Sequence, residues 1–182
     1  MDRRLLGLLA VTALVALAGC SVSFTGDQQV AGANRTATVV HVVDGDTVDV
    51  QFTDGTEERV RLLGVDTPEV HGDVSPGEFE GVPDTEAGRA CLRTWGERAS
   101  DYAVERLDGQ TVTVEFDPVS DRRGGYDRLL AYVVVGNESF NRALVARGYA
   151  RLYDTEFTQR DAYARLERQA RQNDTGLWSC AS

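Results

Sequence analysis

Alternation of apolar and polar residues, together with short apolar or β-branched runs, predicts five short β-strands along the chain. Three of them come first and are separated by tight turns at residues 44–46 and 53–56, which predicts an antiparallel meander. A long helical pattern separates these from the last two. The five predicted strands cover residues 36–43, 47–52, 58–65, 111–116 and 129–135.

Apolar residues at three- and four-residue steps predict a long first helix, and capping residues predict two more helices after it. The first begins after a cap at Asp84 or Thr85 and runs to about residue 107. The second follows Ser139 and runs to residue 147, and the third follows Thr155 and runs to about residue 173. Since Ser and Thr side chains accept hydrogen bonds from the first turn of a helix, both are suitable caps.

The predicted element order is β-β-β-α-β-β-α-α, which indicates an α+β fold that is mainly β. Five strands with a helix between the third and the fourth favour a five-stranded OB-type barrel with three helices. Residues 70–83 are rich in Gly, Pro and acidic residues, and we expect them to form a surface loop. Fold class alone does not determine function.

The N-terminus carries the pattern of an export signal. Residues 5–18 are small or apolar, a run too short for a transmembrane helix of about 20 residues. The "LAGC" that ends at Cys20 resembles a lipobox, in which the cysteine carries lipid. We therefore expect a lipoprotein-type signal peptide at 1–19, a tether at 20–35 and a globular domain at 36–179. This predicts an exported protein that is anchored in the membrane by lipid on Cys20, or alternatively secreted; an uncleaved membrane anchor is a further alternative.

Two cysteines remain beyond Cys20, namely Cys91 and Cys180. An even remainder in an oxidising compartment predicts a disulfide bond between them. Closing a loop of about 90 residues would stabilise the fold by roughly 4–5 kcal/mol in the chain-entropy estimate. The alternative is a pair of buried free thiols.

The composition is acidic, with a formal net charge of −10, and all 19 basic residues are arginine. This composition is typical of salt-loving organisms, because high salt screens repulsion between carboxylates. It argues against a nucleic-acid partner unless the arginines gather in one place, since polyanions bind basic faces.

Five charged residues near strand ends suit phosphodiester chemistry. Asp46 ends the turn into the second predicted strand, and Asp66 lies just past the end of the third, so neighbouring strands could bring them together. Two carboxylates with a carbonyl and waters suit a hard divalent cation. Arg61 and Arg128 could stabilise charge on a phosphate through paired N–H donors. Glu69 could orient or deprotonate a water molecule.

Each of these residues also has an ordinary structural explanation. Asp-Gly-Asp is a common turn, Arg61 could be a charge at a strand edge, and Arg128 could pair with Asp121 or Asp127. His41 and His71 are isolated, which argues against a zinc site.

Four motifs in order, "VVDGDTV", "VRLLGVDTPE", "YDRLLAYV" and "NRALVARGYARL", followed by "GLW", resemble those of the staphylococcal-nuclease-like (thermonuclease) family. The resemblance covers about residues 36–178. It implies an OB-type barrel with three helices and a calcium-dependent nuclease of low sequence specificity.

The resemblance also implies roles for individual residues. Asp46, Asp66 and the Thr67 carbonyl would bind Ca²⁺, and Asp44 would lie behind these ligands. The catalytic residues would be Arg61, Glu69 and Arg128, with Glu69 as the base or water-positioning group. The residues expected to contact substrate are Tyr126, Arg122, Arg123 and Tyr153, with Arg151 adding to a locally positive cleft.

The sequence therefore predicts an extracellular nuclease that hydrolyses DNA, with RNA as a further substrate class. We expect a monomer, because no motif implies a protein partner. The first alternative is a catalytically inactive OB-fold module that binds nucleic acid at the cell surface. The second is a disulfide-stapled surface protein whose acidic loop binds cations structurally.

Overall fold

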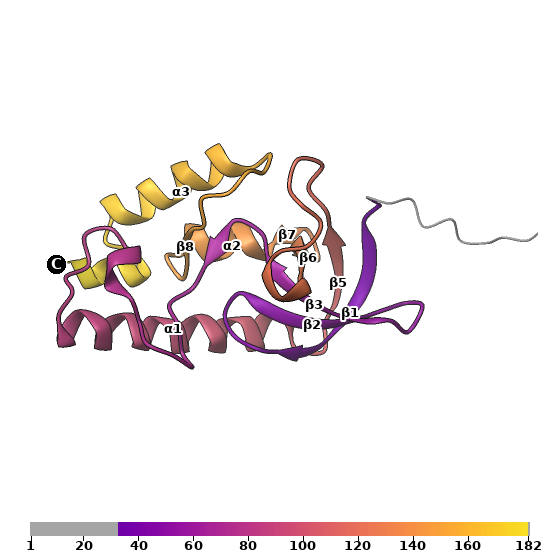
Figure 1. Cartoon of the computed structure of the whole chain (residues 1–182), viewed down its shortest axis with the longest axis horizontal. Helices are drawn as coiled ribbons and strands as arrows, with labels where there is room; N and C mark the ends of the chain where they lie inside the picture. Colours follow the sequence, from indigo (N-terminus) through magenta and orange to yellow (C-terminus); the bar gives the residue numbers. More distant parts are fainter. Residues whose placement is uncertain (1–32, 182) are drawn as a thin grey trace, which may run out of the picture.

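Five strands close into a barrel in the computed structural model, which describes residues 33–181 (Figure 1). The strands are β1 (Arg35–Val42), β2 (Thr47–Phe52), β3 (Glu57–Leu62), β5 (Thr111–Glu115) and β6 (Leu129–Val135). Their order is β3-β2-β1-β5-β6, with antiparallel neighbours, and a parallel β3–β6 pair closes the ring. The five-stranded OB-type barrel in an α+β fold is confirmed.

The alternation of the sequence determines which side of each strand faces the barrel core. In β2, Val48, Val50 and Phe52 are buried while Gln51 between them is exposed. Residues at every second position share one face of a strand, so the apolar set lines the core. The short strand β7 (Glu138–Ser139) extends the sheet beyond β6.

Two of the three helices begin and end close to the predicted positions. Helix α1 (Glu86–Leu107) starts after Thr85, whose hydroxyl accepts a hydrogen bond from the Gly88 amide at 3.1 Å. Helix α2 (Phe140–Ala146) starts after Ser139, which caps it in the same way. One side of α1 is buried along its length, at Gly88, Leu92, Gly96, Ala99, Ala103 and Leu107.

The predicted third strand at residues 58–65 is interrupted, which corrects the prediction of one continuous element. Strand β3 ends at Leu62, and Gly64 turns the chain with φ of 75°. The chain then forms β4 (Val65–Asp66), which pairs with β8 (Arg151–Leu152) outside the barrel. The turn therefore redirects Asp66 away from the barrel sheet.

The last helix begins later than predicted, because Thr155 is not its cap. Helix α3 (Arg160–Gln172) follows Gln159, which makes no side-chain cap bond. The residues before it serve tertiary contacts: Phe157 is buried against Gly64, and Thr158 donates to Asp117. These contacts hold the chain out of helical conformation.

Residues 70–83 form a second small core, so the prediction of a plain surface loop is wrong in this respect. The segment contains a short 3₁₀ helix, η1 (Pro76–Glu78), and buries Val74, Phe79 and Val82. They pack with Leu92 of α1 and with the C-terminal 3₁₀ helix η3 (Gly176–Ala181). Figure 1 shows this region at the end of the molecule opposite the barrel.

The second core carries the disulfide bond between Cys91 and Cys180, whose Cα atoms are 5.8 Å apart. Trp178 is buried there as well. Within residues 33–181, no helix is long and apolar enough to cross a membrane. The predicted signal peptide, most of the tether and Cys20 lie outside the described residues.

Candidate active site

The turn between β1 and β2 places Asp46 beside the end of β3. The Asp44 carboxylate accepts a hydrogen bond from the Asp46 amide at 3.0 Å, which closes the turn. A Cβ atom on Gly45 would lie 2.8 Å from the Cβ of Ala99, so only glycine allows this close approach to α1. The Leu62 amide donates to the Asp46 carbonyl at 2.8 Å and ties the turn to β3.

The carboxylate of Asp46 is almost fully buried, with 1% of the residue exposed. A buried carboxylate needs charged or hydrogen-bonding partners to offset its desolvation. Its Oδ2 accepts from the Thr67 amide at 2.9 Å and from the Thr67 hydroxyl at 3.1 Å. Its Oδ1 accepts from the Thr47 hydroxyl at 3.0 Å and from Arg61.

Arg61 joins the two predicted metal-binding carboxylates. Its Nη1 donates to Asp46, and its Nη2 donates to Oδ1 of Asp66 at 2.5 Å. These bonds span the break after β3, because Arg61 lies in β3 and Asp66 in β4. The Arg61 side chain therefore turns toward the acids rather than standing as an unpaired charge at a strand edge.

Arg151 is a further residue of the site, and the sequence indicated it only as one arginine of a positive cleft. It lies directly opposite Asp66 in the β4–β8 pair, and its Nη2 is 2.7 Å from Oδ2 of Asp66. Asp66 thus has one arginine on each carboxylate oxygen. Only the "ARGYARL" motif hinted at this residue, since nothing local in the sequence shows that β8 pairs with β4.

A niche of about 10 Å³ lies beside Asp46 and is lined by Asp44, Asp46, Arg61, Thr67, Pro68, Glu69 and Val70. This volume is close to the minimum that accommodates one water-sized sphere. Glu69 is exposed at its edge, and within residues 33–181 its carboxylate has no hydrogen-bond or ion-pair partner. The niche brings three predicted acids together.

A larger cleft of about 310 Å³ lies on the other side of Arg61. Its lining includes Arg61, Arg123, Arg128, Asp121 and Tyr153. Arg61 belongs to both the cleft and the niche. The two predicted catalytic arginines therefore face one cavity, and Arg61 separates that cavity from the acids.

Among residues 33–181, no carboxylate pairs with the Arg128 guanidinium. Its Nε donates to the Gly125 carbonyl at 3.2 Å, and its guanidinium carbon lies 5.5 Å from the centre of the Tyr126 ring. Of the predicted alternatives, neither Asp121 nor Asp127 forms an ion pair with it. Tyr126 itself is 95% exposed and has φ of 59°, an uncommon backbone conformation for a residue with a side chain.

The two arginines predicted to contact substrate differ in position. Arg122 stacks on the Phe116 ring, with its guanidinium carbon 3.0 Å from the ring centre, and does not line the cleft. Arg123 does line the cleft, but its Nη2 pairs with Glu58 at 2.7 Å. Within the cleft, positive charge that is free of carboxylates comes mainly from Arg128.

The oxygens of Asp46, Asp66 and Thr67 are of the hard type that Ca²⁺ and Mg²⁺ prefer. Only two carboxylates converge on Arg61, and residues 33–181 contain no group of three or more His, Cys, Asp or Glu residues placed to hold a metal ion. The donors present fit a cation that keeps several water ligands, and they do not form a closed protein cage.

The sequence comparisons identify the family of the chain. Residues 59–180 match the profile of the family described as staphylococcal nuclease homologue. The chain belongs to this family. The match includes Arg61, Asp66 and Arg128, whereas Asp46 precedes it.

Relatives extend the similarity over most of the chain. A thermonuclease of Staphylococcus hyicus is 30% identical over 178 residues, which cover 94% of this chain and 95% of that protein. An uncharacterized protein of Methanocaldococcus jannaschii is 40% identical over 148 residues, 78% of this chain and 70% of its own. Endonuclease YncB of Bacillus subtilis is 32% identical over 145 residues, 78% of this chain and 61% of its own.

Proposed function

We propose that the protein is a calcium-dependent nuclease that hydrolyses phosphodiester bonds in DNA, with RNA as a further substrate class and little sequence specificity. Membership of the staphylococcal nuclease homologue family supports nuclease activity, as do the names of the thermonuclease and endonuclease relatives. One structural observation carries the proposal. Arg61 bonds both Asp46 and Asp66 and also lines the cleft that contains Arg128.

In this proposal the two arginines bind the scissile phosphate. A guanidinium has five N–H donors, and two of those on Arg61 bond the carboxylates. The others remain for phosphate oxygens in the cleft. Arg128 supplies a second guanidinium, which has no carboxylate partner in the part of the chain that the structure describes. Such paired donors stabilise charge that develops on phosphorus.

Glu69 is the proposed general base or water-positioning group. It lies at the edge of the niche beside Asp46, and its carboxylate is free to accept a proton or hold a water molecule. Asp46, Asp66 and Thr67 would hold the divalent cation, which when bound supplies positive charge next to the phosphate. Asp44 supports Asp46 by bonding its backbone amide.

The experiment that tests the proposal is a cleavage assay with the purified protein. Supercoiled plasmid and single-stranded DNA are incubated with calcium or with a chelator, over a series of salt concentrations. We expect cleavage that requires calcium. Absence of cleavage at every salt concentration would contradict the proposal, and tight DNA binding in that case would identify a nucleic-acid-binding module instead.

We also propose that the protein acts outside the cytoplasm, anchored by lipid on Cys20. The proposal rests on the apolar run and the "LAGC" sequence of the N-terminus. Fractionation of cells that express the full chain should place it in the membrane fraction. Cys20→Ala should release it from that fraction, and unchanged membrane association would favour an uncleaved anchor.

A further inference from the structure

Arg151 is the residue through which residues 70–83 reach the candidate active site. Its Nη2 lies 2.7 Å from Oδ2 of Asp66 and 3.3 Å from Oε2 of Glu78. Its guanidinium carbon also lies 5.6 Å from the centre of the Phe79 ring and 5.8 Å from that of Tyr153. The guanidinium is therefore held between the segment 70–83 and the site.

The backbone of Arg151 is fixed as well. The β4–β8 pair sets Arg151 opposite Asp66. The next residue, Leu152, donates its amide to Glu167 of α3 at 2.9 Å, and the Tyr153 amide donates to the Gly64 carbonyl at 3.1 Å. Burial raises the pKa of Glu167, which reflects how closely α3 packs on this strand.

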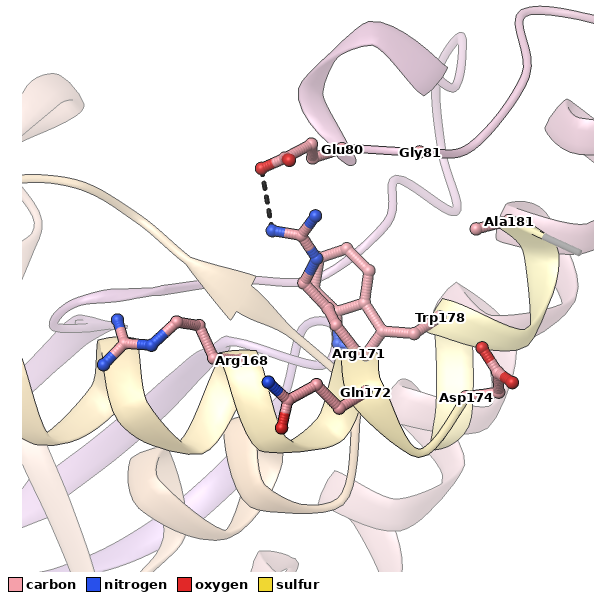
Figure 2. Close-up of a pocket in the computed structure, with 8 residues that line it drawn as sticks. All are labelled: Glu80, Gly81, Arg168, Arg171, Gln172, Asp174, Trp178 and Ala181. Carbon is pink, nitrogen blue, oxygen red and sulfur yellow. Dashed lines mark hydrogen bonds and ion pairs between the residues drawn. The ribbon is translucent and has the colours of Figure 1, made fainter.

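The neighbours of Glu78 are anchored in the second core. Phe79 is 3% exposed and packs with Leu177 and Trp178. The next residue, Glu80, pairs with Arg171 of α3 at 2.7 Å, and the Arg171 guanidinium lies over the Trp178 ring. Figure 2 shows Glu80 reaching toward Arg171, with the tryptophan beside it. The segment that holds Arg151 is thus fixed to α3 and to the C-terminal 3₁₀ helix.

A purely stabilising role does not explain the geometry of Arg151. Its Nε is buried and has no hydrogen-bond partner among the described residues, and a buried donor without a partner reduces stability. Its ion pair with Glu78 is partly exposed, with 55% of the Glu78 side chain accessible, and such pairs contribute little. The arrangement instead fixes both oxygens of Asp66, because Arg151 holds Oδ2 and Arg61 holds Oδ1.

We propose that Arg151 is a positioning residue for the metal site, and that Glu78 and Phe79 hold it in place. The inference rests on the proposed function, because Asp66 is taken as a metal ligand. Partners that bond a ligating carboxylate orient it, and their loss typically weakens metal binding by about 10- to 100-fold. Residues 70–83 would in this way set the calcium affinity of the site, although Val70 is the one residue among them that lines the niche.

The first test measures calcium affinity by titration calorimetry for four variants. Arg151→Gln should bind calcium roughly 10- to 100-fold more weakly, and Arg151→Lys should recover part of this loss because it keeps one charged donor. Glu78→Gln should weaken binding by a smaller factor and leave turnover at saturating calcium close to normal. The matched control is Arg168→Gln, an exposed arginine of α3 without an ion pair among the described residues, which should change nothing.

Unchanged calcium affinity in Arg151→Gln would overturn the inference. A second test separates it from the proposed function. In the presence of a chelator, a double-mutant cycle between Glu78→Gln and Asp66→Asn is measured by urea unfolding. Non-additive shifts of the midpoint that vanish in the Arg151→Gln background would support the link, and additive shifts would overturn it. If the wild-type protein binds no calcium, the proposed function fails, and the cycle still decides whether Arg151 connects Glu78 to Asp66.

Discussion

Glu69 and Asp46 line the same niche, yet their environments differ sharply. Asp46 is buried and accepts hydrogen bonds from Thr47, Arg61 and Thr67, whereas Glu69 is exposed and accepts none among the described residues. A residue that bonds nothing in the folded protein contributes little to stability, but it is free to act on a bound water molecule. The environment of Glu69 therefore favours a catalytic role over a structural one.

Glu69→Gln should therefore lower kcat by about 10²- to 10⁴-fold, the usual contribution of a general base. The urea midpoint should stay unchanged, because no bond within the described residues is lost. Glu97→Gln, an exposed glutamate of α1 without a partner among those residues, is the control for loss of one surface charge. Turnover close to normal in Glu69→Gln would assign the base to another group.

Asp117 links three parts of the chain by hydrogen bonds. It follows β5 and accepts from the Tyr132 hydroxyl at 2.7 Å, from the Val119 amide at 2.9 Å and from the Thr158 amide at 3.0 Å. Burial raises the pKa of the Asp117 carboxyl group. Hydrogen bonds from Thr158, Tyr132 and Val119 more than offset this and lower its pKa to about 2.

The lowered pKa predicts a loss of stability in acid. The folded pKa of about 2 lies below the ordinary value of 3.8, so the carboxylate stabilises the fold above pH 4 by roughly 2 kcal/mol. This contribution should disappear as the pH falls from about 4 to about 2. Urea unfolding over that range should show a shallower pH dependence in Asp117→Asn than in wild type. The control is Asp121→Asn, since the Asp121 side chain accepts no hydrogen bond within residues 33–181, and equal slopes in all three proteins would contradict the assignment.

At the scale of elements, the turn at Gly64 decides where Asp66 lies. Gly64 has φ of 75°, and a Cβ atom there would lie 2.4 Å from the Phe157 ring. Gly55 has a similar φ of 85° but has open space around it. The two glycines form a matched pair, because the same substitution adds backbone strain at both sites and a steric clash at only one.

Gly55→Ala should cost about 1–2 kcal/mol, the price of a left-handed backbone for a residue with a side chain. Gly64→Ala should lower the free energy of unfolding clearly more, since Phe157 must also move. It should also lower kcat, because a displaced β4 would move Asp66 away from Arg61. Urea unfolding and steady-state kinetics measure both effects. Equal costs for the two variants, with normal activity in Gly64→Ala, would show that the turn does not position the site.

These elements also show what the sequence can and cannot reveal. The predicted bounds of strand β6 are those of the structure, because a run of apolar residues ending in three valines between turns depends on local pattern alone. The break after Leu62 was missed, since the pattern of 58–65 is continuous and the break depends on β8 and Phe157, which are distant in sequence. Thr155 was a plausible cap for the same local reason, but the bonds of Thr158 to Asp117 prevent it.

The site residues also divide into those that local motifs predict and those that depend on contacts distant in sequence. The motifs indicated which acids and arginines to consider, and the turn chemistry placed Asp46 next to a strand end. The direction of the Arg61 side chain, the stacking of Arg122 on Phe116 and the contact of Arg151 with Asp66 all depend on pairing between distant strands. Such contacts leave no local signal in one sequence.

At the scale of the whole molecule, salt has opposite effects on the acidic surface, where it screens repulsion, and on the arginine-containing cleft, where it weakens phosphate binding. The net charge of −10 disfavours both the compact fold and the approach of nucleic acid at low salt. Within the cleft, Arg123 is paired with Glu58, so Arg61 and Arg128 are the main groups available for phosphate. Binding that depends on few phosphate contacts loses affinity only moderately as salt increases.

We therefore predict that salt changes KM much more than kcat. With one or two phosphate contacts on single-stranded DNA, KM should rise by roughly 5- to 25-fold between 0.1 M and 1 M salt. The ion pairs around Arg61 are partly buried and so only weakly screened, which should keep kcat within about threefold. Steady-state kinetics on single-stranded DNA at saturating calcium measure both values, and thermal unfolding in the same buffers serves as the control, because screening of like charges should raise Tm with salt. A collapse of kcat while the protein stays folded would contradict the prediction, because it would show that the ion pairs around Arg61 are themselves disrupted by salt.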